Sequence, residues 1–280
     1  MNKNSGESSG ADRISSLPRD LLQKILGCLP LHDADLKHLE LNSCEFNPPP
    51  NFKGFRSLVT LNFQFVTLEP MSFQVLLSSS PLLEHVSMVC CSEFDSFIIE
   101  VPNLKIFKFS STANSLCFRR TPLLEEIVLG MTFNMSESFT VPEPQLTLHN
   151  IKILNFKNLI FSEVEWVAYV LDLINRCPNI ERLLITSYAY TSCACTHPLR
   201  SQEMAMTHSA MKRLKSVDMT LMWVNKTEME FLKHVLAYAT ALEKIYIATS
   251  AEIRHRGMKM MEEMKRFPRA SPNVEFIYHS

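Results

Sequence analysis

The residues with the most obvious capacity for chemistry are the cysteines and histidine of the sequence CACTH. Cys193, Cys195 and His197 are side-chain types that bind zinc, and His208 could supply a fourth ligand. Structural zinc sites, however, favour more widely spaced cysteine pairs and need a second pair of ligands. The C-x-C spacing therefore favours a surface loop, and we predict no metal site and no cofactor.

Patterns that mark catalytic sites are missing from the sequence. None of the six glycines stands in a GxGxxG or GxxxxGK[ST] phosphate-binding loop. The sequence also contains no GxSxG nucleophile elbow and no HExxH zinc helix. Nothing in the sequence thus favours an enzyme, and we expect a protein without catalytic residues.

Charge also narrows the function classes. The formal net charge is -1, which gives no electrostatic case for a nucleic-acid or membrane partner. Residues 252–267 mix both signs and have no aromatic side chains within a sustained basic run, so we predict a solvated helix face rather than a nucleic-acid interface. Met258, Met261 and Met264 recur there at helical spacing, and we expect them to face the core.

The first residues and the cysteines bear on the compartment. Residues 1–11 are polar, without an apolar signal-peptide region, and we expect them to be disordered. No apolar stretch approaches the roughly 20 residues that span a bilayer. The eight cysteines are interpreted as reduced thiols, because nothing places the chain in an oxidising compartment. These features predict a cytoplasmic or nuclear protein.

A repeat runs through almost the whole chain. Nine segments share the pattern apolar-x-x-apolar-x-apolar, and their first positions are 20 to 34 residues apart. The triplets are Leu36/Leu39/Leu41, Leu58/Leu61/Phe63, Leu83/Val86/Met88, Leu104/Phe107/Phe109, Leu124/Ile127/Leu129, Ile151/Leu154/Phe156, Ile180/Leu183/Ile185, Leu214/Val217/Met219 and Leu242/Ile245/Ile247.

The spacing within each unit is that of a leucine-rich repeat. The fourth and sixth positions are two residues apart, so a strand sends both side chains to the same face. One unit cannot bury this face alone, whereas stacked units share one core. Cys44 and Cys91 occupy the ninth position of two units, where a side chain turned inward to the loop is expected. We therefore predict a structural role for both cysteines.

Helices are expected where the units are longest. Ser162 and Glu165 form a capping-box pattern at the start of residues 162–178, and Thr227 and Glu230 form another at the start of residues 227–240. A shorter helix is expected within residues 72–81. Strand inside and helix outside, repeated, predicts an α/β fold, a curved leucine-rich repeat solenoid.

Binding would use the strand positions that point away from the core, which are the third and fifth of each unit. They mix charged, amide, aliphatic and aromatic groups, which suits one particular protein surface better than a uniform polymer. Ordinary exposed strand surface is the other interpretation. The candidate target-binding residues are His38, Glu40, Thr60, Asn62, His85, Ser87, Lys108, Asn155, Arg182, Asp218 and Tyr246.

Both ends of the chain resemble known plant motifs. Residues 12–34 resemble the opening of an F-box, and FPRASP, residues 267–272, resembles the FBD domain that closes many F-box proteins. The sequences FKGFRSLVTLNF and SSSPLLEHVSM between them are similar to the leucine-rich region of the same proteins. The chain is therefore identified as a member of the plant F-box/FBD/LRR-repeat family.

This resemblance implies a substrate receptor of a cullin-RING ubiquitin ligase of the SCF type. It implies a partial F-box at 12–35, leucine-rich repeats at 36–204 and an FBD domain at 205–280 that continues the solenoid. The F-box would bind a Skp-type adaptor, and through it a cullin, while the repeats would hold an unidentified protein substrate. The adaptor-binding residues would be Leu17, Pro18, Leu21, Leu22, Ile25, Leu26, Leu29 and Pro30.

The F-box sequence stops early. After residue 34 an F-box continues through further helical sequence, whereas here Asp35 leads directly into Leu36 of the first repeat. An alternative transcript or an incorrect gene model would each produce this junction. A lone first helix is marginal in water, so we expect adaptor binding to be weakened or lost. The apolar stripe of this helix could instead cover the open end of the solenoid.

Three functions follow as hypotheses. The first is a ubiquitin-ligase receptor whose attachment to the ligase is impaired. The second is a ligase-independent repeat protein that binds the same target and competes with a complete version. The third, an enzyme, has no motif to support it.

Overall fold

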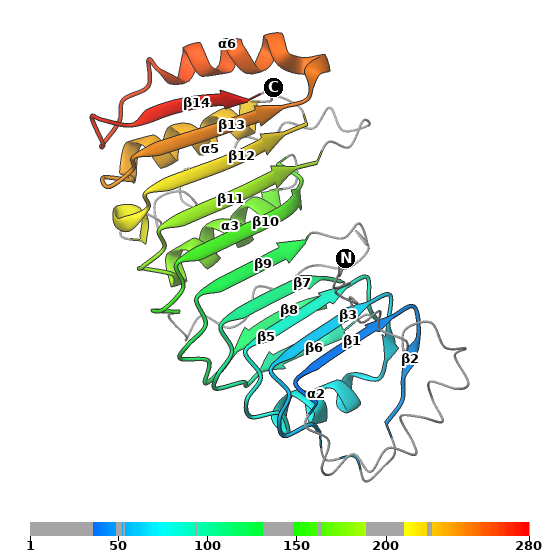
Figure 1. The fold of residues 1–280 in the computed structure, drawn as a ribbon. Helices are drawn as coiled ribbons and strands as arrows, with labels where there is room; N and C mark the ends of the chain where they lie inside the picture. The colour runs from blue at the N-terminus through cyan, green and yellow to red at the C-terminus, as the bar shows by residue number, and fades with distance from the viewer. Residues whose placement is uncertain are drawn as a thin grey trace, which may run out of the picture.

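The computed structural model describes residues 36–48, 52, 54–92, 94–111, 113–130, 148–161, 164–188, 210–222 and 226–279. Its main feature is a ten-stranded sheet in which every strand pairs in parallel with its neighbours (Figure 1). The strands, in spatial order, are β1 (His38–Asn42), β3 (Thr60–Gln64), β5 (His85–Val89), β7 (Ile106–Ser110), β9 (Glu126–Gly130), β10 (Ile153–Leu159), β11 (Arg182–Ser187), β12 (Ser216–Leu221), β13 (Lys244–Thr249) and β14 (Glu275–His279).

The strand registers align the repeat units one by one. At the fourth position, Leu39 of β1 pairs with Leu61 of β3, and Val217 of β12 pairs with Leu183 on one side and Ile245 on the other. At the fourth and sixth positions the side chains of all nine triplets are buried, as the pattern predicts. The predicted α/β leucine-rich repeat solenoid is confirmed.

The tenth strand, β14, was not among the nine predicted units. Its residues Phe276 and Tyr278 pair with Ile245 and Ile247 of β13. The buried Val274 precedes Phe276 by two residues, whereas the corresponding positions are three residues apart in the other units. Because one residue is missing, β14 does not match the triplet pattern, although it pairs in parallel with β13 like the other strands of the sheet.

In the first half of the stack the outer layer consists mainly of short strands. These are β2 (Glu45–Phe46), β4 (Thr67–Leu68), β6 (Phe94–Ile99) and β8 (Ala113–Phe118), with one short helix, α2 (Pro70–Ser78). The prediction did not include these strands. After β1, β3 and β5 the chain turns through Ser43, Phe65 and Cys90, which have positive φ values of 52°, 53° and 50°. This turn directs the ninth residue of each unit inward.

In the second half the outer layer is helical (Figure 1). It contains α3 (Val164–Arg176), the 3₁₀ turn η2 (Ala210–Arg213), α5 (Lys226–Tyr238), the 3₁₀ turn η3 (Ala251–Ile253) and α6 (Arg254–Met264). Helix α5 buries Leu232, Val235 and Leu236 against the sheet side of this layer.

Two predictions about these helices are wrong in detail. Helix α5 begins at Lys226, so Thr227 lies in the first turn and is buried rather than standing before the helix as its cap. In α6 the buried face is Gly257, Met260, Met261 and Met264, while Met258 is 53% exposed. Since Gly257 adds no apolar side chain, the sequence pattern favoured the wrong methionine.

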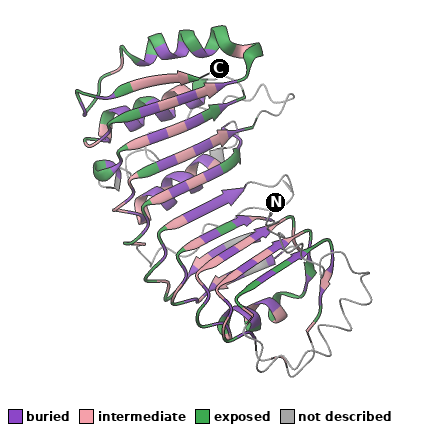
Figure 2. Cartoon of the chain, viewed as in Figure 1, coloured by how far each residue is buried: buried purple, intermediate pink, exposed green. Residues whose placement is uncertain are grey.

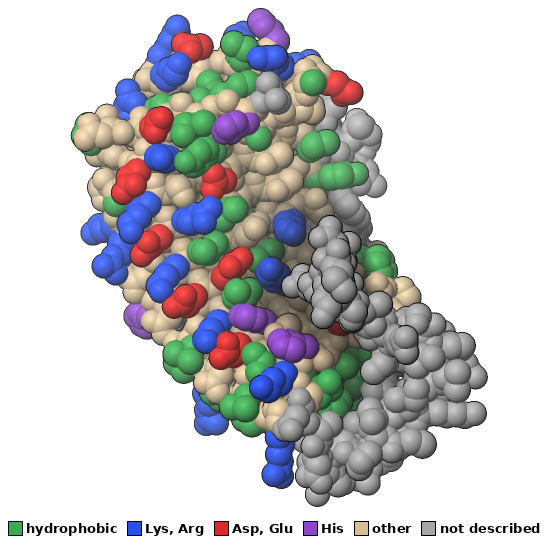
Figure 3. Space-filling model, viewed as in Figure 1, with side chains coloured by type: hydrophobic (Ala, Val, Ile, Leu, Met, Phe, Trp, Pro, Cys, Tyr) green, Lys and Arg blue, Asp and Glu red, His purple; other side chains and the backbone are tan. Residues whose placement is uncertain are grey.

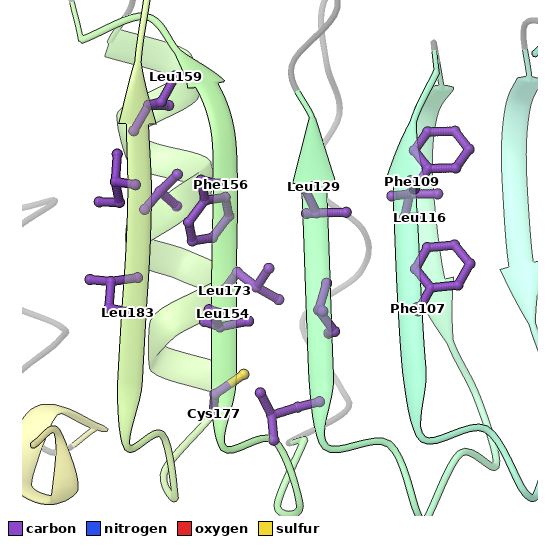
Figure 4. Close-up of a cluster of buried hydrophobic side chains, with 14 of the residues drawn as sticks. Phe107, Phe109, Leu116, Leu129, Leu154, Phe156, Leu159, Leu173, Cys177 and Leu183 are labelled. Carbon is purple, nitrogen blue, oxygen red and sulfur yellow. The ribbon is translucent and has the colours of Figure 1, made fainter. Parts of the chain in front are cut away.

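One apolar core runs between the sheet and the outer layer (Figure 2). In the first half it is rich in phenylalanine, and a chain of ring contacts runs through Phe46, Phe63, Phe73, Phe97, Phe107 and Phe118 in that order. Figure 4 shows the junction of the halves, where the phenyl rings of Phe107 and Phe109 on β7 are followed by Leu129, and then by Leu154 and the ring of Phe156 on β10 and Leu173 on α3.

The turns that enter the strands are joined by side-chain amides. The Nδ2 group of Asn103 donates to the carbonyl of Pro81 at 2.8 Å, and that of Asn179 donates to the carbonyl of His149 at 2.7 Å. Asn150 makes the equivalent bond to Pro122. These bonds satisfy carbonyls that the parallel ladder does not reach, and they hold each unit in register with the one before.

Candidate protein-binding face

The face of the ten-stranded sheet opposite the outer layer carries the candidate binding residues. We call it the open face and define it by the third and fifth residues of each unit. The candidates His38, Glu40, Lys108 and Arg182 are exposed, and the others are half-buried. The strand registers place all of them in two parallel rows, so the solenoid brings residues from distant parts of the sequence onto one surface. Their role in binding stays a prediction.

At the β1 end of the open face the polar groups bind one another. The Asn62 Nδ2 group donates a hydrogen bond to Glu40 Oε1 at 3.0 Å. The Asn62 Oδ1 atom is buried and has no hydrogen-bond donor within the described part of the chain. Glu40 and Asn62, both candidate residues, are therefore joined by a hydrogen bond, and the Asn62 Oδ1 atom could still accept one.

The middle of the open face is aliphatic, which the candidate set did not include. Ile106 and Ile153 occupy third positions on β7 and β10, and Val128 and Leu184 occupy fifth positions on β9 and β11. From β7 through β9 and β10 to β11, the aliphatic residue is at the third, fifth, third and fifth position of successive units. The four side chains therefore form a zigzag across the sheet, which we call the aliphatic zigzag. Val128 is only 4% exposed although it does not belong to the core cluster.

Charged residues lie next to this aliphatic zigzag. Lys108 pairs in register with Val128, and Glu126 lies between Ile106 and Ile153. An apolar centre with a charged rim is typical of surfaces that bind other proteins. The outward-facing aliphatic residues were the available signal, because an exposed strand position has no structural need for isoleucine or leucine.

The β14 end of the open face contains an ion pair and an aromatic stack. Arg182 lies across the strands from Asp218, with the closest nitrogen and oxygen 3.6 Å apart. Burial raises the pKa of Asp218, and Arg182 only partly opposes this effect. The rings of Tyr246 and His279 are stacked with centroids 6.4 Å apart and an interplanar angle of 12°.

A row of alternating charges borders the strand starts (Figure 3). The second residues of successive units form the pairs Glu84–Lys105, Glu125–Lys152 and Glu181–Lys215, with nitrogen-to-oxygen distances of 2.8 to 2.9 Å. A hydrogen bond from Lys215 lowers the pKa of Glu181. Because each acid already has a lysine and is at least 34% exposed, these pairs offer little to a ligand and stabilise the fold weakly.

The two ninth-position cysteines have the predicted structural role. Cys44 is buried, and the Cys91 thiol lies 3.6 Å from the carbonyl oxygens of Phe63 and Val89. Burial raises the pKa of Cys91, which disfavours the reactive thiolate. Within the described residues no group of three metal-ligating side chains occurs. Cys193, Cys195, His197 and His208 lie outside those residues.

The predicted adaptor-binding residues also lie outside the described residues, because the described chain begins at Leu36. The predicted capping box of Ser162 and Glu165 likewise falls outside the side chains that the structure describes. Among the residues that are described, no helix is long and apolar enough to cross a membrane.

Comparison with known proteins agrees with the repeat architecture. A family model described as "At1g61320/AtMIF1, LRR domain" matches residues 29–198, which is more than half of the chain. The chain belongs to this leucine-rich repeat family. The match begins just before the first repeat and ends beyond β11, so it includes most of the open face.

A curated relative is similar over a larger part of the chain. The F-box/FBD/LRR-repeat protein At1g13570 of Arabidopsis thaliana is 26% identical over 283 residues, which cover 86% of this chain and 66% of the relative. The chain thus spans slightly less than two thirds of the length of the relative. The family match and this relative confirm the resemblance to plant F-box/FBD/LRR-repeat proteins, and they support a protein-interaction role in general terms.

Proposed function

We propose that this chain binds a target protein through the open face and serves as the target-recognition subunit of an SCF-type ubiquitin ligase. The protein it binds would be the one that the ligase modifies, and the chemistry would belong to other subunits. We place this role in the cytoplasm or the nucleus. The F-box/FBD/LRR-repeat relative supports the ligase part of the proposal.

The observation that carries the binding part is the aliphatic zigzag at the centre of the open face. Ile106, Ile153 and Leu184 are only half-buried, so they keep apolar surface exposed to water. Covering such surface stabilises a complex by roughly 25 cal/mol for each Å² removed from water. The surrounding Lys108, Glu126 and Arg182 would then set the orientation of the partner, because charged rims favour one arrangement over others.

Docking on the ligase is expected to be weak. The F-box sequence ends after its first helix, so the stripe from Leu21 to Leu29 lacks the companion helices of a complete F-box. This favours a second candidate function, a ligase-independent module that holds the same target and competes with a complete F-box protein.

The binding part is tested by substituting the centre of the open face. We expect Ile153→Arg to abolish capture of the partner, since it places a charge in the apolar contact. Val75→Arg is a matched control, because Val75 is an exposed aliphatic residue on α2 in the outer layer. Quantitative cross-linking mass spectrometry would identify proteins bound by the wild-type chain and by Val75→Arg but not by Ile153→Arg. If Ile153→Arg retained every partner, the open face would not be the binding surface.

The ligase part is tested by co-purification with a Skp-type adaptor. A complete F-box protein serves as the reference. The variant Leu22→Asp places a charge within the apolar stripe that would contact the adaptor. We expect far weaker retention than for the reference. Retention equal to the reference and sensitive to Leu22→Asp would show that the shortened F-box is sufficient and would exclude the competitor function.

A further inference from the structure

Asp218 differs from the other carboxylates near the open face. Its side chain is 28% exposed, and its nearest cation, Arg182, lies at 3.6 Å, close to the upper limit for an ion pair. By contrast, Glu125 and Glu181 are 54% and 41% exposed and have lysines at 2.8 Å. Asp218 is thus the more buried carboxylate and has the weaker partner.

Such a carboxylate is costly to the fold. Removing a charge from water without full pairing disfavours the charged form. Within the described chain, Arg182 is the cation that opposes the burial of Asp218, and burial prevails, so the pKa of Asp218 is raised. A second cation at this position would therefore recover electrostatic energy that the free protein does not obtain.

Tyr246 supplies an aromatic wall beside Asp218. The two residues are paired in register on β12 and β13, so their side chains leave the same face of adjacent strands. The ring of Tyr246 is stacked on His279, which supports it from the β14 side. A carboxylate next to an aromatic ring is suited to a basic side chain, because the ring attracts a cation within about 6 Å of its centroid.

From this arrangement we propose that Asp218 and Tyr246 form a binding site for one arginine or lysine side chain of the partner protein. The site lies beside Leu184, at the border of the aliphatic zigzag, so the partner would present a basic residue next to its apolar contact. Arginine fits best, since its planar group donates two hydrogen bonds to a carboxylate and stacks on a ring. This inference rests on the proposed function of the open face.

The experiment uses a probe rather than the unidentified partner. The full chain, with its tyrosine rings labelled with ¹³C, is titrated with N-acetyl-arginine amide and followed by NMR. N-acetyl-citrulline amide, which has nearly the same shape without the charge, is the control ligand. We expect saturable shifts of the Tyr246 resonances with the arginine probe, with a dissociation constant on the order of 10 mM for one side chain, and no saturation with citrulline.

Substitutions then separate this site from general charge effects. Asp218→Asn should abolish saturation, whereas Glu181→Gln, which removes an exposed and already paired carboxylate, should not change it. Arg182→Met should strengthen binding of the probe several-fold, because Arg182 competes for the same carboxylate. A purely structural role of Asp218 would not produce that gain.

The outcomes distinguish this inference from the proposed function. Equal shifts with both ligands, or saturation that survives Asp218→Asn, would overturn the basic-side-chain site. Either result would leave the effect of Ile153→Arg on partner capture intact. Retention of every partner by Ile153→Arg, together with normal probe binding, would instead overturn the proposed function.

Discussion

The two halves of the solenoid use the same inner sheet but different outer layers. From β1 to β7 the units are 20 to 25 residues long, and short strands with one short helix form the outer layer. From β10 to β14 the intervals are longer, and helices α3, α5 and α6 form it. A helix needs more residues than an extended segment to cover the same length, so the length of the repeat decides which element covers the sheet.

The two kinds of outer layer contribute side chains of different size to the core. In the outer strands β6 and β8 the buried positions include the large side chains of Phe94, Phe97 and Phe118. A helix presents residues at three- and four-residue intervals, and α3 fills its part of the core with smaller groups such as Leu171 and Ile174. The comparison teaches that few large or many small side chains can cover the same repeated sheet.

The largest expected effect tests this division of the core. Phe97→Ala should lower the free energy of unfolding by about 3–5 kcal/mol, since Phe97 contacts the rings of Phe73, Phe94 and Phe107 and few neighbours can fill the cavity. Leu171→Ala on α3 should cost about 2–4 kcal/mol, because a smaller side chain is removed. Urea unfolding followed by circular dichroism measures both values.

Fluorescence shows whether the halves unfold together. Both tryptophans and all tyrosines lie at or after Trp166, so their emission reports on the second half alone. If neighbouring units are strongly coupled, Phe97→Ala should shift the tryptophan transition as well. A shift in circular dichroism without a shift in fluorescence would mean that the halves unfold separately.

Two glycines sharpen the comparison at an intermediate scale. Gly54, in the first half, has a φ of 76°, and an added Cβ would meet the backbone carbonyl oxygen of Ser79 at 2.8 Å. Gly54→Ala should therefore cost about 2–3 kcal/mol. At Gly257 on α6 the nearest atom would be the Tyr278 hydroxyl at 2.7 Å, at the end of a side chain.

Gly257→Ala should consequently change stability by less than about 1 kcal/mol. Displacing Tyr278 weakens its hydrogen bond to Thr249, but alanine favours the helix more than glycine does, by a similar amount. Thermal unfolding of both variants against the wild-type chain measures the difference. A loss at Gly257 as large as that at Gly54 would show that α6 is as rigid as the segment before β3.

Much of the fold could be predicted from the sequence because the core pattern is local. The triplets fix which residues face inward, and this is a property of each strand alone. The outer strands β2 and β4 have two residues each, too few for alternation to be recognised. Strand β14 was missed because one residue is absent before Phe276, and the face of α6 because Gly257 carries no side chain.

The open face was harder to predict than the core. Its two rows follow directly from the strand pattern, so the positions of Asn155 and Tyr246 could be foreseen. The candidate list kept mainly the polar members of these rows and left out Ile153 and Leu184, although the alignment of the repeats places both on neighbouring strands. The partial burial of Asp218 depends on side chains from β11 and β13, which are distant in sequence.

The smallest effect compares carboxylates on the open face of the two halves. The folded-state pKa of Asp218 is raised above its unfolded value, so its ionisation destabilises the folded protein at neutral pH. Protonation as the pH falls through the folded-state pKa removes this cost, and the wild-type chain gains stability relative to Asp218→Asn over that interval. The groups that face Asp218 are Arg182 on β11 and, on β13, Tyr246 and the exposed Lys244, which pairs in register with Ser216 two residues before Asp218.

Asp218→Asn should therefore leave stability at pH 7 unchanged or slightly higher, while it abolishes binding of the arginine probe. The exposed Glu40, on β1 in the first half, provides the matched control Glu40→Gln. Urea unfolding of the three proteins between about pH 4 and pH 7 measures the difference, which should narrow as Asp218 becomes protonated. A clear loss of stability in Asp218→Asn at pH 7 would mean that the pair with Arg182 supports the fold. A carboxylate that binding needs and folding does not is expected at a functional site, because selection for function retains groups that stability alone would remove.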